Sequence, residues 1–262
     1  MARNARRPPE KEPRDELRQL ALDLDLTALA DGLEEHLARA EKESLSYTDF
    51  ALVLLGGERQ ARVTRRRERS LKRSHLGPIE GLDGFDFAAR PQLEPRVIKE
   101  LCNCRFVEEK RNILCVGKPG LGKTRIAKAV AHAACVAGYS TLCITAADML
   151  EDLQASHADG TFKRALRRYA KPQVLLLDEF GHTGSFDQKA TNHLYRVVAA
   201  RYRQASIILT ANTGFASWKH LFPSESSAIA TVDRLVDQAT ILRFTGKSFR
   251  DPKEVVGAPL DD

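Results

Sequence analysis

Apolar residues in the first part of the chain recur at helical spacing. In the run "DELRQLALDLDLTALADGLEEHLARAEKE" leucines recur at intervals of three and four positions, which is typical of amphipathic helices. The following run, "SLSYTDFALVLL", predicts a short apolar helix whose N-cap is Ser46 or Thr48. This helix is expected to end at Gly56 and Gly57.

The second part of the chain alternates between short apolar runs and helix-length segments. Five of these runs predict strands, namely "NILCVG", "STLCIT", "VLLLDEF", "SIILTAN" and "TILRFTG". A helical stretch at residues 96–110 precedes them, and helix-length segments separate the first four. Regular alternation of strands and helices favours a parallel sheet that is covered on both faces. The predicted fold class is therefore α/β.

Composition marks the boundaries between these parts. Residues 1–14 are rich in proline and charge, and we expect a disordered tail there. The segment 76–95 is rich in glycine and proline and is expected to be a linker. The domains expected around it are a small all-helical domain at residues 15–75, an α/β domain at 96–250 and a C-terminal tail at 251–262.

Charge adds one local feature to this picture. The net charge of +6 favours anionic partners. Eight Arg or Lys fall within the fifteen positions of "RQARVTRRRERSLKR", inside the basic segment 58–75. This segment is a candidate nucleic-acid contact, a targeting signal or the solvated face of a helix. The residues expected to contact DNA are Arg65, Arg66, Arg67, Arg69, Lys72 and Arg73.

Cysteine usage and hydropathy limit the class of protein. The five cysteines form no CxxC pair, which fits a reducing compartment, and the histidines are too scattered to indicate zinc. No apolar run approaches the roughly 18 to 20 residues of a membrane span. We therefore expect a cytoplasmic protein that makes no membrane contact.

The run "GKPGLGKT" fits the phosphate-loop pattern GxxxxGK[ST], with a predicted strand before it and a predicted helix after it. Backbone amides in such a loop surround phosphates at a helix N-terminus, Lys123 neutralises the β and γ phosphates, and Thr124 ligates Mg²⁺. ATP and Mg²⁺ are thus the expected cofactors. The predicted nucleotide-binding residues are Gly117, Lys118, Pro119, Gly120, Leu121, Gly122, Lys123, Thr124 and Arg125.

Polar side chains at two strand ends add hydrolytic chemistry. Asp178 and Glu179 end the strand "VLLLDEF", where Asp178 can hold Mg²⁺ and Glu179 can act as general base. Asn212 ends "SIILTAN" and can orient the attacking water or the γ phosphate. Alternatively, it is an ordinary turn residue at the end of the strand. The phosphate loop and the two carboxylates together favour hydrolysis.

Two arginines are weaker candidates. Arg234 follows the strand that ends in Asn212 and can supply a guanidinium to the transition state of a neighbouring subunit. Alternatively, Arg234 is an ordinary surface arginine that pairs with Asp233 or Asp237. Arg250 is either a γ-phosphate sensor or a surface charge.

In this order, the motifs resemble those of the IstB-like ATPases, transposition helper proteins of insertion sequences that are related to DnaC-type helicase loaders in the AAA+ superfamily. The likeness spans about residue 80 to residue 250 and includes segments without catalytic groups. It rests on "FVEEKRNILCVGKPGLGKTRIA", "DGTFKRALRRY", "VLLLDEFGH", "RYRQASIILTANTGFASW" and "DRLVDQATILRFTGKSFR". The segment "LDGFDF" also resembles the short aromatic stretch that precedes the family's ATPase core.

The resemblance implies a P-loop AAA+ ATPase core without a separate lid domain, preceded by a helical domain. It implies an oligomeric regulator of transposition that binds double-stranded DNA non-specifically, hydrolyses ATP, and recruits or stimulates its cognate transposase. The roles it implies are Walker A for Lys123 and Thr124, Walker B for Asp178 and Glu179, sensor 1 for Asn212, arginine finger for Arg234, and a terminal motif for Arg250.

Some positions depart from the family, and two other functions stay open. Lys118 and Leu121 stand where the family often has Pro and Thr, and "TAN" stands for its usual "TSN". Gly56 and Gly57 fall where relatives tend to stay helical, which argues against one long helix entering the basic segment.

The alternative functions are a DnaC-like replicative helicase loader and a nucleotide-gated DNA-binding module that does not hydrolyse ATP.

Overall fold

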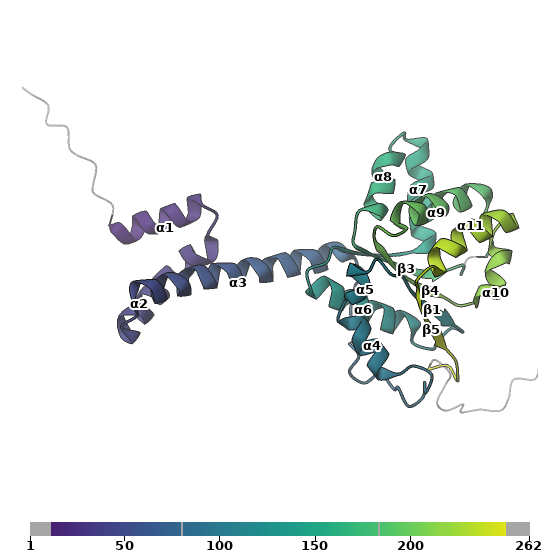
Figure 1. The fold of residues 1–262 in the computed structure, drawn as a ribbon. Coiled ribbons are helices and arrows are strands. Elements are labelled where there is room, and N and C mark those ends of the chain that lie inside the picture. Colours follow the sequence, from purple (N-terminus) through teal and green to yellow (C-terminus); the bar gives the residue numbers. More distant parts are fainter. Residues whose placement is uncertain (1–11, 80, 183, 250–262) are drawn as a thin grey trace, which may run out of the picture. The chain divides into compact units, whose positions relative to one another are not determined.

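The computed structural model describes residues 12–79, 81–182 and 184–249 (Figure 1). The chain divides into two compact units, Met1–Glu68 and Arg69–Asp262. Most of the expected N-terminal tail and all of the expected C-terminal tail lie outside the described residues. No helix in the described ranges is long and apolar enough to cross a membrane.

The first unit is helical, as its leucine spacing predicts. It contains α1 (Pro13–Asp23), α2 (Thr27–Glu43) and most of α3 (Tyr47–Ser74). A proline begins α1, where its fixed φ suits the first helical turn. Helix α1 packs on α2 around a small buried core of Ala21, Leu29, Ala30 and Leu33.

Helix α3 is longer than the sequence suggests. Its start agrees with the prediction, since the Ser46 hydroxyl accepts a hydrogen bond from the amide of Asp49 at 3.2 Å. Its predicted end at Gly56 and Gly57 is wrong, because α3 continues to Ser74 and neither glycine adopts the positive φ of a helix end. Each glycine costs only about 1 kcal/mol in a helix interior, which the residues on both sides outweigh.

Glu58 anchors this continuous helix to the start of α2. Its carboxylate is buried and accepts the amides of Ala28 at 2.9 Å and Leu29 at 3.1 Å, two donors left open by the helix start. Arg62 and Arg65 donate to its other oxygen at 2.9 and 3.0 Å. Burial raises the pKa of Glu58, but these hydrogen bonds offset it and leave that pKa lowered.

The second unit confirms the predicted α/β class and all five predicted strands. Its sheet is parallel, with the strand order β2-β3-β4-β1-β5. The strands are β1 (Ile113–Gly117), β2 (Thr141–Thr145), β3 (Val174–Phe180), β4 (Ser206–Ala211) and β5 (Thr240–Phe244). β4 lies in the middle of the sheet, and all six of its residues are buried.

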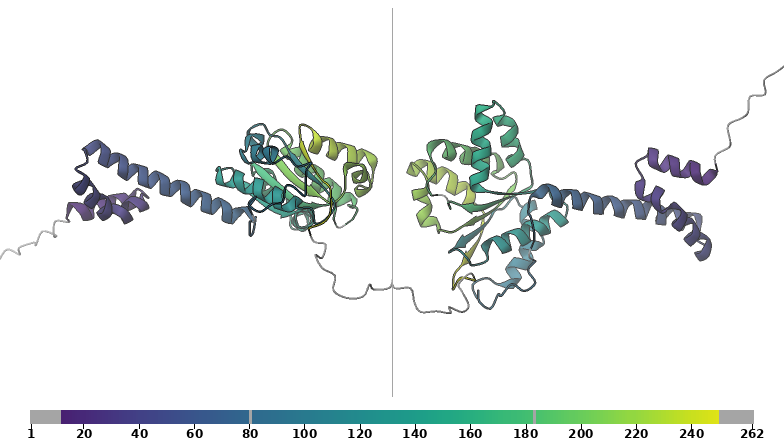
Figure 2. Two further views of the ribbon diagram at one scale, coloured as in Figure 1. Left: turned by 90° about the horizontal axis from the view of Figure 1, so that it is seen from below. Right: turned by 180° about the vertical axis from the view of Figure 1, so that it is seen from behind.

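Helices cover both faces of the sheet (Figures 1 and 2). They are α4 (Pro95–Cys102), α5 (Arg105–Glu108), α6 (Lys123–Val136), α7 (Ala146–Ala158), α8 (Phe162–Ala170), α9 (Gln188–Arg201), α10 (Phe215–Trp218) and α11 (Glu225–Val236), with a 3₁₀ turn at Lys219–Leu221. Alternate residues of β3 enter opposite cores: Leu175 and Leu177 pack with α7, α8 and α9, whereas Val174 and Leu176 pack with α4, α5 and α6. All five cysteines are free, and four are buried.

Arg201 joins the start of β4 to the turn that precedes β3. Its fully buried guanidinium donates to the carbonyl oxygens of Tyr169 at 2.7 Å, Pro172 at 2.8 Å and Ser206 at 2.6 Å. Burial lowers the pKa of Arg201 to about 9, so the side chain is still charged at neutral pH. The carbonyl dipoles stabilise this charge and hold the two central strands in place.

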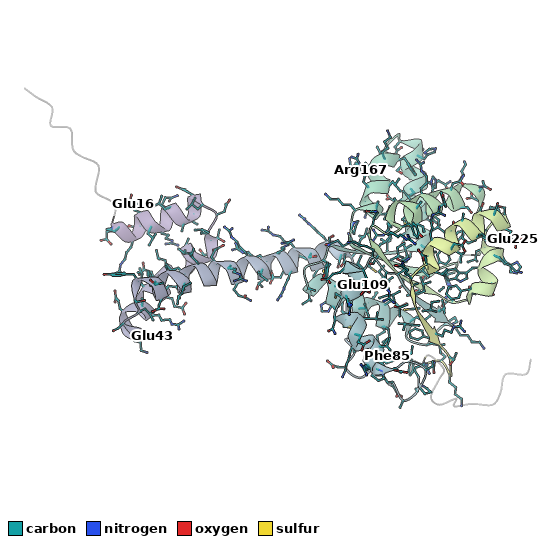
Figure 3. The ribbon with its side chains drawn as sticks, viewed as in Figure 1. Glu16, Glu43, Phe85, Glu109, Arg167 and Glu225 are labelled. Atoms are coloured by element: carbon teal, nitrogen blue, oxygen red, sulfur yellow. The ribbon has the colours of Figure 1, made fainter. Side chains whose placement is uncertain are left out.

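The segment 76–95 packs on the second unit, which differs from the expected linker. Leu76, Phe85 and Leu93 belong to the core around α4 and α6, and Figure 3 shows Phe85 in this segment. Arg90 is 1% exposed and donates to the carbonyl oxygen of Lys247 at 2.6 Å. Glycine and proline indicate turns, but they do not decide whether the apolar residues between the turns are buried.

Candidate functional site

The phosphate loop joins β1 to α6, as its flanking sequence predicts. Two glycines are required there by close contacts. A Cβ on Gly117 would lie 2.2 Å from the carbonyl oxygen of Phe244, and a Cβ on Gly122 would lie 2.7 Å from the ring of Phe85. Gly122 also has φ +89° at the N-cap of α6. The loop therefore turns tightly enough to present its backbone amides at the start of a helix.

Two side chains at the start of α6 face the phosphate position. Lys123 is almost fully buried, and its ammonium group donates to the carbonyl oxygen of Lys118 at 2.7 Å, which holds it across the loop. The hydroxyl of Thr124 donates to Oδ1 of Asp178 at 2.9 Å. The structure thus brings the predicted Thr124 and Asp178 into direct contact.

The end of β3 is irregular at the two predicted carboxylates. Leu177 pairs with Leu209 and Phe180 with Ala211, so Asp178 and Glu179 together face a single residue of β4. This is a β-bulge. It interrupts the regular alternation of side chains between the two faces of the sheet at Asp178 and Glu179. Glu179 has φ +57°, a strained conformation for a residue with a side chain, and such strain concentrates at functional sites.

Thr210 is the residue of β4 that faces this bulge. Its buried hydroxyl accepts the amide of Glu179 at 3.0 Å and donates to Oδ1 of Asp178. Sequence reasoning missed Thr210 because a threonine inside an apolar run has the composition of an ordinary strand. Its position two residues before Asn212, which places both on one face of an extended chain, was the available signal.

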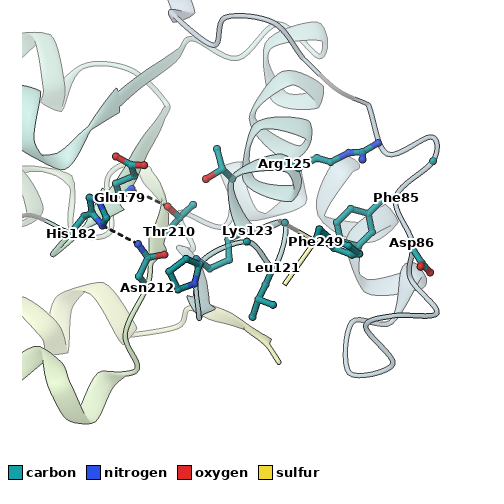
Figure 4. A pocket seen from close by; sticks show the side chains of 15 residues that line it. Phe85, Asp86, Leu121, Lys123, Arg125, Glu179, His182, Thr210, Asn212 and Phe249 are labelled. Atoms are coloured by element: carbon teal, nitrogen blue, oxygen red, sulfur yellow. Dashed lines mark hydrogen bonds between the residues drawn. The ribbon is translucent and has the colours of Figure 1, made fainter. Parts of the chain in front are cut away.

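Asn212 lies beside a histidine that sequence reasoning considered only as a zinc ligand. The amide Nδ2 of Asn212 is 3.2 Å from Nδ1 of His182 (Figure 4). His182 follows β3 in a turn closed by its own amide, which donates to the carbonyl oxygen of Glu179 at 3.1 Å. The spacing of three residues after Glu179 was the signal that could have indicated it.

These groups line one cavity of about 750 Å³, a size typical of small-molecule sites (Figure 4). The phosphate loop forms its floor, and Glu179, His182, Thr210 and Asn212 line one side. The other side consists of Gly84, Phe85, Asp86 and Phe249. The cavity therefore has one end with the predicted catalytic groups and another with two aromatic rings beside Asp86.

The aromatic end is held by the segment before α4 and the residues after β5. The ring centroids of Phe85 and Phe249 are 6.0 Å apart, and the guanidinium of Arg90 lies 4.1 Å from the Phe249 centroid. The predicted nucleotide-binding residue Arg125 lines the cavity and donates to the carbonyl oxygens of Gly81 and Asp83. Its position fits a role in fixing this wall.

The donor set fits a magnesium nucleotide. Mg²⁺ is bound in proteins by one or two oxygen side chains together with phosphate oxygens and water, and Thr124 and Asp178 supply such oxygens beside the phosphate loop. In the described ranges no group of three or more His, Cys, Asp or Glu could hold a metal ion. The hydroxyl of Thr124 and the carboxylate of Asp178, beside the phosphate loop, suit an ion that arrives with a phosphate ligand.

Arg234 lies away from this cavity, on α11. Its guanidinium donates to the carbonyl oxygen of Ala230 and lies 5.1 Å from the ring centroid of Tyr195 and 5.8 Å from that of Tyr202. Asp237, one of its expected surface partners, instead pairs with Arg203 at 3.0 Å. Arg250 lies outside the described residues.

The predicted DNA contacts lie on α3 and differ in their surroundings. Arg65 is half-buried, because it donates to Glu58 and to the hydroxyl of Thr27. The others are exposed, namely Arg66, Arg67, Arg69, Lys72 and Arg73.

Comparison with known proteins agrees with this geometry. Residues 19–255 match the family model described as IstB-like ATP binding protein. A protein of Geobacillus stearothermophilus, named for ATP binding in insertion sequence IS5376, is 34% identical over 87% of this chain and 90% of its own length. The corresponding protein of insertion sequence IS21 from Pseudomonas aeruginosa is 33% identical over 90% of this chain and 88% of its own length.

Solved structures share the fold of the second unit. AMPPCP-bound DnaA from Aquifex aeolicus matches 65% of this chain and 51% of its own, with a TM-score of 0.54 and 19% identity. The DnaC helicase loader matches 68% of this chain and 99% of its own, with a TM-score of 0.50 and 18% identity. The family model and the two relatives show that the chain belongs to the IstB-like ATP-binding protein family, and with its phosphate loop and parallel-sheet fold it is an ATPase of the AAA+ type.

Proposed function

We propose that this protein is a Mg²⁺-dependent ATPase that acts on DNA as an oligomer and recruits or stimulates a transposase at the target. The observation that carries the proposal is the contact of Thr124, Asp178, Thr210 and Glu179 at one edge of the sheet beside the phosphate loop. Two relatives that match nearly the whole chain carry names of insertion-sequence proteins, which supports transposition over helicase loading.

Each residue of the site has a separate role in ATP hydrolysis. Lys123 neutralises the β and γ phosphates, and Thr124 and Asp178 would hold Mg²⁺, which would offset charge on the phosphate oxygens. Glu179 accepts a proton from water as the water oxygen bonds to the γ phosphorus. The bond from that phosphorus to the β–γ bridging oxygen breaks, and ADP and phosphate leave. Asn212 orients the water.

We assign Arg234 to the site of a neighbouring subunit. Its distance from its own cavity and its support by two tyrosine rings suit a guanidinium presented to another copy. Such an arrangement makes each active site depend on assembly, and it would couple hydrolysis to oligomer formation on DNA.

Binding to double-stranded DNA is assigned to the exposed arginines and lysine of α3. Contacts from these side chains to phosphate oxygens carry no base information, so binding should be salt-sensitive and independent of sequence. Arg65 is excluded from the test of this surface, because its bonds to Glu58 and Thr27 stabilise the helical unit.

Replacing Glu179 with Gln should reduce steady-state ATP turnover about 100-fold or more while preserving ATP binding, because the amide cannot accept the water proton. Phosphate release and binding of a fluorescent ATP analogue measure the two properties. Glu151→Gln, an exposed glutamate of α7, is the matched control and should keep full turnover. Equal turnover in the wild type and Glu179→Gln would contradict the ATPase assignment.

Mixing Arg234→Ala with Glu179→Gln tests the assignment between subunits. Each variant alone should be nearly inactive, whereas random mixing should restore roughly a quarter of wild-type turnover, since some interfaces combine an intact Glu179 with an intact Arg234. Phosphate release is measured across a range of mixing ratios. A mixture no more active than its components would place Arg234 outside the neighbouring site.

Replacing Arg66 and Arg67 together with Ala should weaken duplex binding equally for unrelated sequences and lower the slope of log affinity against log salt by about 2. Fluorescence anisotropy on two unrelated duplexes from low to moderate salt measures this slope. Arg18→Ala combined with Arg39→Ala removes the same charge from α1 and α2 and should leave it unchanged. An unchanged slope in the α3 variant would mean that this surface is only a solvated helix face.

A further inference from the structure

The side chain of His182 is held against Asn212 by a rigid turn. The amide of His182 donates to the carbonyl oxygen of Glu179, and Gly181 between them has φ +71°. This φ is strained for a residue with a side chain, so glycine is favoured in this turn. Both His182 and Asn212 line the nucleotide cavity, and Figure 4 shows their side chains directed toward each other.

A side-chain amide carries a donor on one side and an acceptor on the other, so the group it meets on one side decides what it presents on the other. Nδ1 of His182 lies 3.2 Å from Nδ2 of Asn212. A neutral imidazole that carries its proton on Nε2 accepts a hydrogen bond at Nδ1. The NH₂ group of Asn212 then faces His182, and Oδ1 faces away from it.

We propose that His182 is a positioning residue, which holds Oδ1 of Asn212 toward the water that attacks the γ phosphate. The inference rests on the proposed ATP hydrolysis and adds to it a reason for the orientation of this water. A water between the Glu179 carboxylate and Oδ1 of Asn212 directs both of its hydrogens to acceptors. Its lone pair is then free to face the phosphorus, which is the orientation that in-line attack requires.

The opposite amide orientation has a different kinetic consequence. If the NH₂ group of Asn212 faced the cavity, it would donate to a γ-phosphate oxygen and would strengthen binding of ATP itself. Loss of His182 would then raise KM. With Oδ1 toward the water, loss of His182 lowers kcat and leaves KM near its original value, because the interaction involves the nucleophile and not the nucleotide.

Two variants of His182 test the proposal in steady-state ATP turnover by the full-length protein. His182→Ala should lower kcat about 3- to 10-fold, the effect of one lost positioning hydrogen bond, with KM for ATP within about 2-fold of the wild type. His182→Asn should restore most of kcat, since an asparagine Oδ1 is attached to the chain like Nδ1 of histidine and accepts the same hydrogen bond. His220→Ala, which removes another exposed histidine, is the matched control and should change neither constant.

Three results would overturn the proposal: an unchanged kcat in His182→Ala, a raised KM at unchanged kcat, or a His182→Asn variant as slow as His182→Ala. Glu179→Gln in the same assay separates these failures from a failure of the ATPase assignment. If the wild type hydrolyses ATP no faster than Glu179→Gln, both the ATPase assignment and the positioning role fail. If the wild type and His182→Ala hydrolyse ATP equally fast, and much faster than Glu179→Gln, only the positioning role fails.

Discussion

The hydroxyl group of Thr210 connects the two carboxylate-bearing residues of β3 to the central strand of the sheet. It accepts the amide of Glu179 and donates to Oδ1 of Asp178, and the same oxygen receives the hydroxyl of Thr124 from the start of α6. One carboxylate oxygen therefore links three elements: the helix after the phosphate loop, β3 and β4. The bulge at Asp178 and Glu179 and the positive φ of Glu179 both occur at this junction.

The rest of the second unit keeps this junction in place. The strand order sets β4 between β3 and β1, so the ends of these strands and the phosphate loop share one edge. Arg201 holds the start of β4 against the turn before β3, and the packed segment 76–95 closes the aromatic end of the cavity. The strained conformation of Glu179 is stable because the packing around it fixes both β3 and β4.

Much of this arrangement could be predicted from the sequence, because the signals were local. The phosphate loop, the five apolar strands and the carboxylates at a strand end each lie within a few consecutive residues. What sequence reasoning missed depends on contacts between distant segments. Thr210 and His182 acquire their positions through the strand order and a tight turn, and α3 passes through Gly56 and Gly57 because burial of Glu58 against α2 stabilises the continued helix.

The Thr210 hydroxyl thus holds Asp178 and Glu179 in their working geometry. Mg²⁺-dependent ATP turnover in Thr210→Val compared with Thr210→Ser tests this role, with thermal melting to verify that both variants fold. Valine keeps the shape but removes the hydroxyl, so turnover should fall about 10-fold or more, whereas serine should stay near the wild type. A folded Thr210→Val protein with wild-type turnover would contradict this account of the site.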